Sequence, residues 1–257
     1  MNYTKLTKEF SELCKARGFS KSGKTFSRCI GDGIYQNISI AENSYLSPFC
    51  AEYSSTNKTS PCIKIGFWSM YSFLHPLYFI ERKHIGNFHP ENILGISIDR
   101  TPFNGLSAQY EIMTKTGFDL LDSMTTQNKL VDTIDMLMTA MHGAGLSHST
   151  ELAAPYYLCG DRTRALSVLR NLYAQNYITF HHKYDYLKQT KQYDEYITKE
   201  EELLYGMKEH TYFLKLIGGN RKEEITDYML TCLNQNIQYA KENKIAFADN
   251  FAPLLKK

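Results

Sequence analysis

Apolar residues recur at helical spacing from Thr4 to Arg17, and charged residues occupy the other side of the same stretch. This pattern predicts an amphipathic helix at the start of the chain. Gly18 suits the left-handed position that commonly ends a helix, and Phe19 can fold back on the last turn. We therefore expect the helix to end at Arg17 or Gly18.

The pattern then changes to alternation, which is typical of strands. Residues 25–30 and 34–41 flank Gly31-Asp32-Gly33, whose glycines can adopt the positive φ of a tight turn. In the second of these stretches, isoleucines and Gln36 share one face and more polar residues share the other. This arrangement predicts a β-hairpin with one buried face.

Further short stretches extend the predicted sheet. Residues 62–68 alternate as a third strand, and residues 94–99 and 106–113 alternate as a fourth and a fifth. Residues 42–61 are polar and rich in turn formers, which predicts a loop with one short strand near residues 49–53. The first half of the chain is thus expected to be one helix followed by an antiparallel sheet.

Helical periodicity dominates the second half. It predicts a helix over 120–141, one that starts after Gly160-Asp161, and one over 203–217 that is closed by two glycines. Asn220, with Glu223 three residues later, predicts a capping-box start for the last helix. Strands followed by helices predict an α+β fold, with a helix and antiparallel sheet in residues 1–116 and a helical domain in residues 117–257.

The composition is that of an ordinary globular protein. The chain has 257 residues, of which 43% are hydrophobic and 22% are charged, with a formal net charge of +2. The absence of an apolar run of about 18 residues predicts no membrane partner, and the absence of a hydrophobic leader predicts a cytoplasmic protein. Six cysteines include no C-x-x-C pair, so we expect free and mostly buried thiols and no zinc knuckle.

Charge is distributed unevenly along the chain. Residues 1–116 carry 13 Lys and Arg against 9 Asp and Glu, while residues 117–257 carry 16 against 18. The basic excess is concentrated near the start, so it could form a face for phosphate, nucleic acid or an acidic protein, or simply a solvated helix face. The candidate ligand-binding residues are Lys21, Lys24, Arg28 and Tyr35.

Gly18, Gly23, Lys24 and Thr25 match the G-x-x-x-x-G-K-[ST] pattern of phosphate-binding loops. Such a loop joins the end of a buried strand to the start of a helix, so that backbone N–H groups converge on phosphate. Here the predicted order is the reverse, because a helix precedes Gly18 and a strand follows Thr25. We therefore interpret the match as a coincidence.

The same residues carry a family resemblance. The N-terminal helix, Gly18-Phe19, the basic stretch, Gly23-x-x-Phe26 and the hairpin leading to Gln36-Asn37-Ile38 resemble the opening of a bacterial domain-of-unknown-function family, numbered four-three-zero-four. The resemblance covers residues 4–115. It implies a cytoplasmic α+β domain, with an immunity-like binding role as one interpretation, and it supplies no catalytic residues.

The sequence contains few clusters of candidate catalytic or metal-binding residues. His181 and Asp185 lie at i and i+4 of a predicted helix, an arrangement that fits a surface pair or two ligands of a metal-dependent hydrolase. We find no nucleophile motif and no complete ligand set, so no catalytic residue, metal or cofactor is predicted. Tyrosines crowd residues 173–205, where they fit helix packing or a binding surface: Tyr173, Tyr177, Tyr184, Tyr186, Tyr193, Tyr196 and Tyr205.

Three functional hypotheses follow. The first is a non-enzymatic protein, with an immunity-like role as one form of it, whose partner is another protein. The second is a phosphate, nucleotide or nucleic-acid binder that uses the basic stretch from Lys21 to Arg28, with nucleic acid the less favoured ligand. The third is a metal-dependent hydrolase centred on His181 and Asp185. The first is favoured, because the sequence offers no credible catalytic set.

Overall fold

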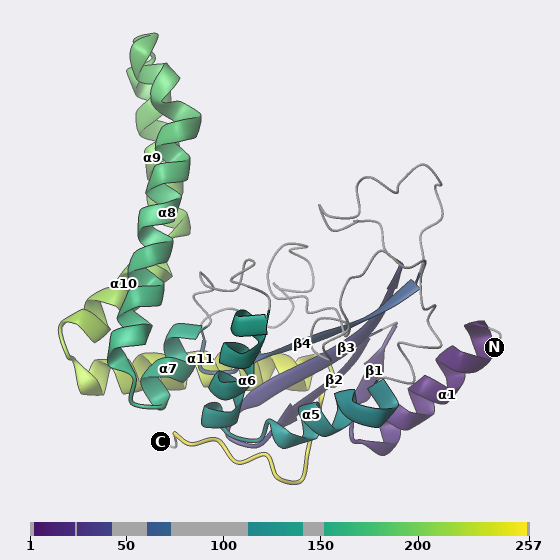
Figure 1. The fold of residues 1–257 in the computed structure, drawn as a ribbon. Coiled ribbons are helices and arrows are strands. Elements are labelled where there is room, and N and C mark those ends of the chain that lie inside the picture. Colours follow the sequence, from purple (N-terminus) through teal and green to yellow (C-terminus); the bar gives the residue numbers. More distant parts are fainter. Residues whose placement is uncertain (1–2, 24, 43–60, 73–112, 141–151, 256–257) are drawn as a thin grey trace.

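The computed structural model describes residues 3–23, 25–42, 61–72, 113–140 and 152–255. It has an N-terminal helix, an antiparallel sheet and a series of helices, which confirms the predicted α+β class (Figure 1). The elements are α1 (Tyr3–Ala16), β1 (Ser20–Ser22), β2 (Thr25–Ile30), β3 (Ile34–Glu42), β4 (Pro61–Ser69), the short π-helix η2 (Met113–Gly117), α5 (Phe118–Ser123), α6 (Gln127–Ala140), α7 (Ala153–Leu158), α8 (Arg162–Gln189), α9 (Tyr193–Gly206), α10 (Lys208–Gly218), α11 (Lys222–Glu242) and β5 (Ala246–Phe247).

The first helix ends at Ala16, one residue before the earliest expected end at Arg17, but it has the predicted type of ending. Gly18 has a φ of +80°, and the N–H of Phe19 donates to the carbonyl of Cys14 at 3.0 Å. The N–H of Gly18 donates to Lys15, which completes a Schellman ending. Phe19 is 3% exposed, so the turn directs its ring into the core.

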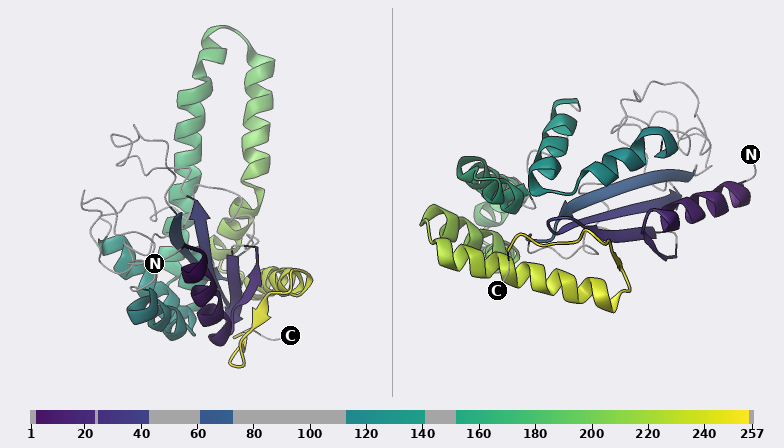
Figure 2. Two further views of the ribbon diagram at one scale, coloured as in Figure 1. Left: turned by 90° about the vertical axis from the view of Figure 1, so that its right-hand side faces the viewer. Right: turned by 90° about the horizontal axis from the view of Figure 1, so that it is seen from below.

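The hairpin and the third strand are confirmed, and β1 to β4 form an antiparallel sheet in sequence order. The prediction of a single buried face is wrong. Gln36 and Ile38 are buried on one face of β3, and Tyr35 and Asn37 are buried on the other. Figure 2 (right) shows the reason: α5 and α6 cover one face of the sheet, while α11 covers the opposite face.

A short strand departs from the all-helical second half that the sequence predicts. β5 pairs in parallel with β2, with Ala246 opposite Arg28 and Phe247 opposite Cys29. β1 pairs with Thr25–Ser27, so β1 and β5 share one edge of β2.

The main core crosses the predicted boundary at residues 116 and 117. One cluster of buried side chains contains Phe10 and Phe26 from the first half together with Phe118, Leu169 and Leu233 from the second. The predicted division into two domains therefore lies within a continuous region of packing. The predicted strands at 49–53, 94–99 and 106–112 lie outside the described residues, while Met113 begins η2.

Several helix boundaries differ from the sequence prediction. The helix expected over 120–141 is broken between Ser123 and Gln127, and the one expected over 203–217 belongs to α9 and α10. Asn220 has a φ of +54°, and Arg221 occupies the N-cap of α11 without a side-chain cap bond. The predicted capping box is therefore wrong, because Asn220 is used in the turn that ends α10. The start of α8 is confirmed, since Asp161 accepts a bond from the N–H of Arg164.

Candidate functional site

The four residues named as ligand-binding do not form a common surface. Arg28 is 4% exposed and Tyr35 is 1% exposed, so both lie inside the protein. Lys21 is exposed, with its Nζ 5.5 Å from the centre of the Phe26 ring, and Lys24 lies outside the described residues. The expected basic face therefore does not include Arg28 or Tyr35, because both side chains make internal contacts.

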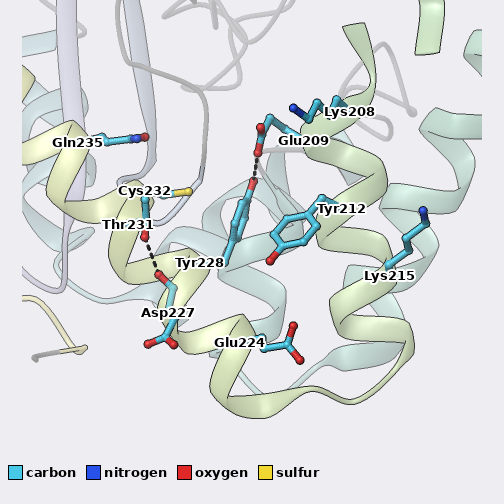
Figure 3. Close-up of a pocket in the computed structure, with 10 residues that line it drawn as sticks. All are labelled: Lys208, Glu209, Tyr212, Lys215, Glu224, Asp227, Tyr228, Thr231, Cys232 and Gln235. Carbon is cyan, nitrogen blue, oxygen red and sulfur yellow. Dashed lines mark hydrogen bonds between the residues drawn. The ribbon is translucent and has the colours of Figure 1, made fainter. Parts of the chain in front are cut away.

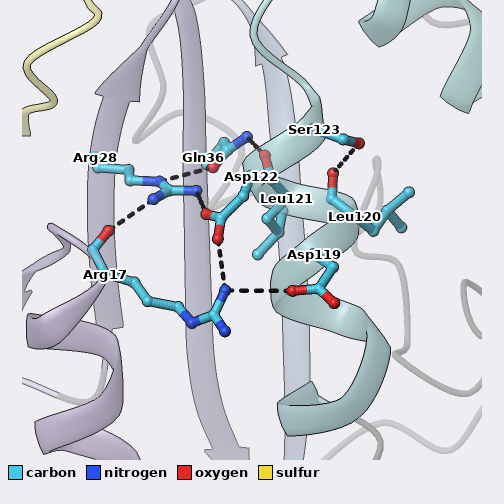
Figure 4. Close-up of polar contacts among 8 residues, drawn as sticks. All are labelled: Arg17, Arg28, Gln36, Asp119, Leu120, Leu121, Asp122 and Ser123. Atoms are coloured by element: carbon cyan, nitrogen blue, oxygen red, sulfur yellow. Dashed lines mark hydrogen bonds and ion pairs between the residues drawn. The ribbon is translucent and has the colours of Figure 1, made fainter.

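Arg28 is the centre of a polar network that joins α1, the sheet and α5 (Figure 4). Its Nε donates to Gln36, one of its Nη atoms donates to the carbonyl of Arg17, and the other pairs with Asp122 at 2.5 Å. Burial lowers the pKa of Arg28, while the bond to Asp122 opposes this change. These three acceptors occupy the guanidinium, so we interpret the network as structural.

Tyr35 is likewise held by its neighbours. Its hydroxyl donates to Ser27 at 2.8 Å, and its ring stacks on Trp68 with the centroids 4.3 Å apart. Burial raises the pKa of Tyr35. The residue contributes to the core between the sheet and α11.

The geometry around the phosphate-loop pattern agrees with its interpretation as a coincidence. A helix ends at Ala16 before the pattern, and a strand begins at Thr25 at its end. A phosphate-binding loop requires a helix N-terminus at that place. The reversed order, predicted from the sequence, is confirmed.

His181 and Asp185 form the expected pair on α8. The Nδ1 of His181 lies 3.1 Å from a carboxylate oxygen of Asp185, and the hydroxyl of Tyr196 lies 3.4 Å from the same nitrogen. Both side chains of the pair are about half exposed. Within the described ranges, no three His, Cys, Asp or Glu side chains are grouped so that they could hold a metal, so the geometry fits a surface hydrogen bond.

Cys14, Cys29, Cys159 and Cys232 are free thiols, and all of them except Cys159 are buried. Burial raises the pKa of each of the buried thiols to about 12. At neutral pH they remain protonated, which makes them poor nucleophiles.

A groove of about 860 Å³ lies between α10 and α11 (Figure 3). Tyr212 and Tyr228 lie in it with their ring centroids 5.6 Å apart, and the hydroxyl of Tyr228 donates to Glu209 at 3.5 Å. Burial raises the pKa of Tyr228. The lining mixes lysines with carboxylates and contains no activated nucleophile, so no reaction class is favoured: Lys208, Glu209, Tyr212, Lys215, Glu224, Asp227, Tyr228, Thr231, Cys232 and Gln235.

The most distinctive feature is an arm that rises from the body of the protein. α8 and α9 run antiparallel and extend well beyond the sheet and its covering helices (Figures 1 and 2). α8 has 28 residues, which corresponds to a length of about 42 Å. We define the arm as residues 173–206.

A small core separate from the main one holds the arm together. It contains Phe180, Leu187 and Tyr196 as buried residues, with Tyr184 and Leu203 packed against them. The rings of Phe180 and Tyr196 meet edge to face with their centroids 5.2 Å apart. The arm therefore folds around its own contacts.

The outer surface of the arm is unusually apolar. In the described residues, nine large apolar side chains are exposed, and six of them lie on the arm: Ile178, Tyr186, Tyr193, Ile197, Leu204 and Tyr205. Tyr205 is the most exposed of them, at 81%. Such a concentration of apolar surface is typical of an interaction site.

The sequence indicated this surface only in part. Tyr196 is buried and Tyr173, Tyr177 and Tyr184 are half-buried, whereas Tyr186, Tyr193 and Tyr205 are exposed, so the tyrosines serve both packing and surface. Sequence reasoning missed Ile197 and Leu204. Their signal was an apolar spacing at i and i+7 within an otherwise acidic helix.

Comparisons of the chain with models of protein families, with curated proteins and with solved structures found no match. The resemblance of residues 4–115 to the family numbered four-three-zero-four stays a prediction. Among the described helices, none combines the length and the apolar character that crossing a bilayer requires.

Proposed function

We propose that this chain is a non-enzymatic protein-binding module of the immunity-like type, and that the arm is its contact element. The observation that carries the proposal is the exposure of six large apolar side chains on a projecting pair of helices. Exposed apolar surface costs free energy in water, and burial by a partner recovers about 25 cal/mol for each Å² covered. Tyrosine is also enriched at protein interfaces, because its ring is large and rigid and its hydroxyl is polar.

Two matched substitutions test the role of the arm. Ile197 on α9 is 50% exposed, and Met136 on α6, away from the arm, is 49% exposed. Affinity capture from the host of origin should recover a protein with the wild-type chain and with Met136→Gln, and should recover much less of it with Ile197→Gln. Equal recovery with the two variants would show that the arm is not the contact element.

The genes adjacent to the coding sequence test the immunity-like role. A toxin-like reading frame beside this one, whose product is captured by the wild-type chain, is the expected result. Capture of a partner encoded elsewhere, with no effect of the chain on the toxicity of any neighbour, would leave a binding module without the immunity role.

A further inference from the structure

α9 presents an outward apolar stripe, which we define as Tyr193, Ile197 and Leu204. These side chains are 55%, 50% and 43% exposed. Their spacing of i, i+4 and i+11 places them on one face of the helix over about 17 Å. Tyr196 and Leu203 belong to the arm's own core and face α8. Ile197 and Leu204 each come one residue later in the helix, so the stripe is turned about 100° away from that core.

Negative charge surrounds this stripe. α9 contains five Asp and Glu residues and one Lys. That lysine, Lys199, already pairs with Glu202 at 2.9 Å. Asp194, Glu200 and Glu201 lie beside the stripe at 100° per residue, and within the described part of the chain they form no ion pair.

A second copy of the chain is a poor match for this surface. Pairing of α9 with α9 of another copy would bring two acidic helices together, and like charges at an interface are costly. Lys188 of α8 already lies over the Tyr196 ring, with its Nζ 4.0 Å from the centroid. The missing positive charge is therefore not supplied by α9 of a second copy.

We infer that the α9 stripe docks a basic amphipathic helix of the partner. Such a helix has apolar residues at three- and four-residue spacing, flanked by Lys and Arg. Its apolar side chains cover Ile197 and Leu204, its cationic groups meet the unpaired carboxylates, and a guanidinium can stack on Tyr193. The inference rests on the proposed function, and it specifies the chemistry of the partner.

Three labelled peptides of 18 residues test this inference by fluorescence anisotropy with the full chain. The first combines leucine at helical spacing with lysine, the second replaces every lysine by glutamate, and the third replaces every leucine by serine. The leucine–lysine peptide should bind at least tenfold more tightly than either of the others. Its affinity should fall about threefold or more with Ile197→Gln, and also with Asp194→Asn combined with Glu201→Gln, while Met136→Gln leaves it unchanged.

The results that would contradict the inference can be told apart by experiment. Equal binding of the lysine and glutamate peptides, or binding that Ile197→Gln does not weaken, overturns the inference. A wild-type dimer in sedimentation that Ile197→Gln converts to a monomer assigns the stripe to a second copy and also overturns it. If capture from the host depends on Ile197 but the peptides do not discriminate, the proposed function stands and the partner class is wrong.

Discussion

Asp122 on α5 accepts a charged hydrogen bond from Arg28 on β2, although 94 residues separate the two in the sequence. The Arg28 side chain is 5% exposed and that of Asp122 is 40% exposed. Arg17 reaches the same carboxylate from the end of α1. One acidic side chain therefore holds together the first helix, the sheet and the helix that covers it.

Replacement of Asp122 by Ala should lower the free energy of unfolding by about 2–3 kcal/mol, because it leaves the buried guanidinium of Arg28 without its counter-charge. Urea denaturation at neutral pH measures this change. Asp119, on the same helix, is 72% exposed and lies 3.6 Å from Arg17. Asp119→Ala should cost less than about 1 kcal/mol, and equal costs for the two variants would contradict the importance of burial.

The turn between β2 and β3 should not tolerate a side chain at Gly31. This residue has a φ of +53°, and a Cβ there would clash with the carbonyl oxygen of Thr125. We expect Gly31→Ala to lower the free energy of unfolding by more than about 3 kcal/mol, because the strain of the positive φ and the clash with the Thr125 backbone both destabilise the fold. Gly18→Ala, at a φ of +80° with open space around it, should cost about 1–2 kcal/mol. Thermal and urea unfolding of both variants distinguish the two effects.

His210 should make the protein less stable in mild acid. Burial lowers the pKa of His210 from 6.5 to about 4. Between these values the unfolded chain binds a proton that the folded chain does not, so stability falls as the pH drops from 7 towards 4.5, by about 2–3 kcal/mol from this residue. His210→Gln should remove that part of the decline in urea titrations at several pH values. An identical slope in the wild type and in His210→Gln would contradict the prediction.

The arm should unfold independently of the body, because its core is a separate cluster. Phe180→Ala removes the central ring, and burial of such a ring is worth about 3–5 kcal/mol. Hydrogen exchange followed by mass spectrometry should show much faster exchange in residues 176–200 and unchanged protection in β2 and β3. Phe26→Ala in the main core should instead accelerate exchange throughout. Faster exchange in the sheet of Phe180→Ala would show that arm and body unfold together.

Features that depend on local periodicity and on turn residues could be predicted from the sequence. The Schellman ending at Gly18, the hairpin at Gly31-Asp32-Gly33 and the start of α8 after Asp161 depend on residues close in sequence, and all three are confirmed. The break between α5 and α6 is different. It is stabilised by the N–H of Asp32, which donates to Thr125, and by the Asp32 carboxylate, which accepts from the N–H of Gln127.

The candidate site could be predicted from the sequence only in part. The turn at the tip of the arm contains Lys191 at a φ of +60°, so no glycine marks it in the sequence. The basic stretch could not reveal that Arg28 is buried, because its partner Asp122 lies far along the chain. Exposure of Ile197 and Leu204 depends on how α9 is turned against α8, which only the packing of the arm defines.

The parallel pairing of β5 with β2 has a consequence for synthesis on the ribosome. The edge of β2 at Arg28 and Cys29 gains its hydrogen-bonding neighbour only after residues 246 and 247 have been made. At about 5–20 residues per second, that edge waits on the order of 10–40 s, during which it can pair with another nascent chain. Chaperone occupancy should therefore persist on this protein until residues 246 and 247 have left the ribosome.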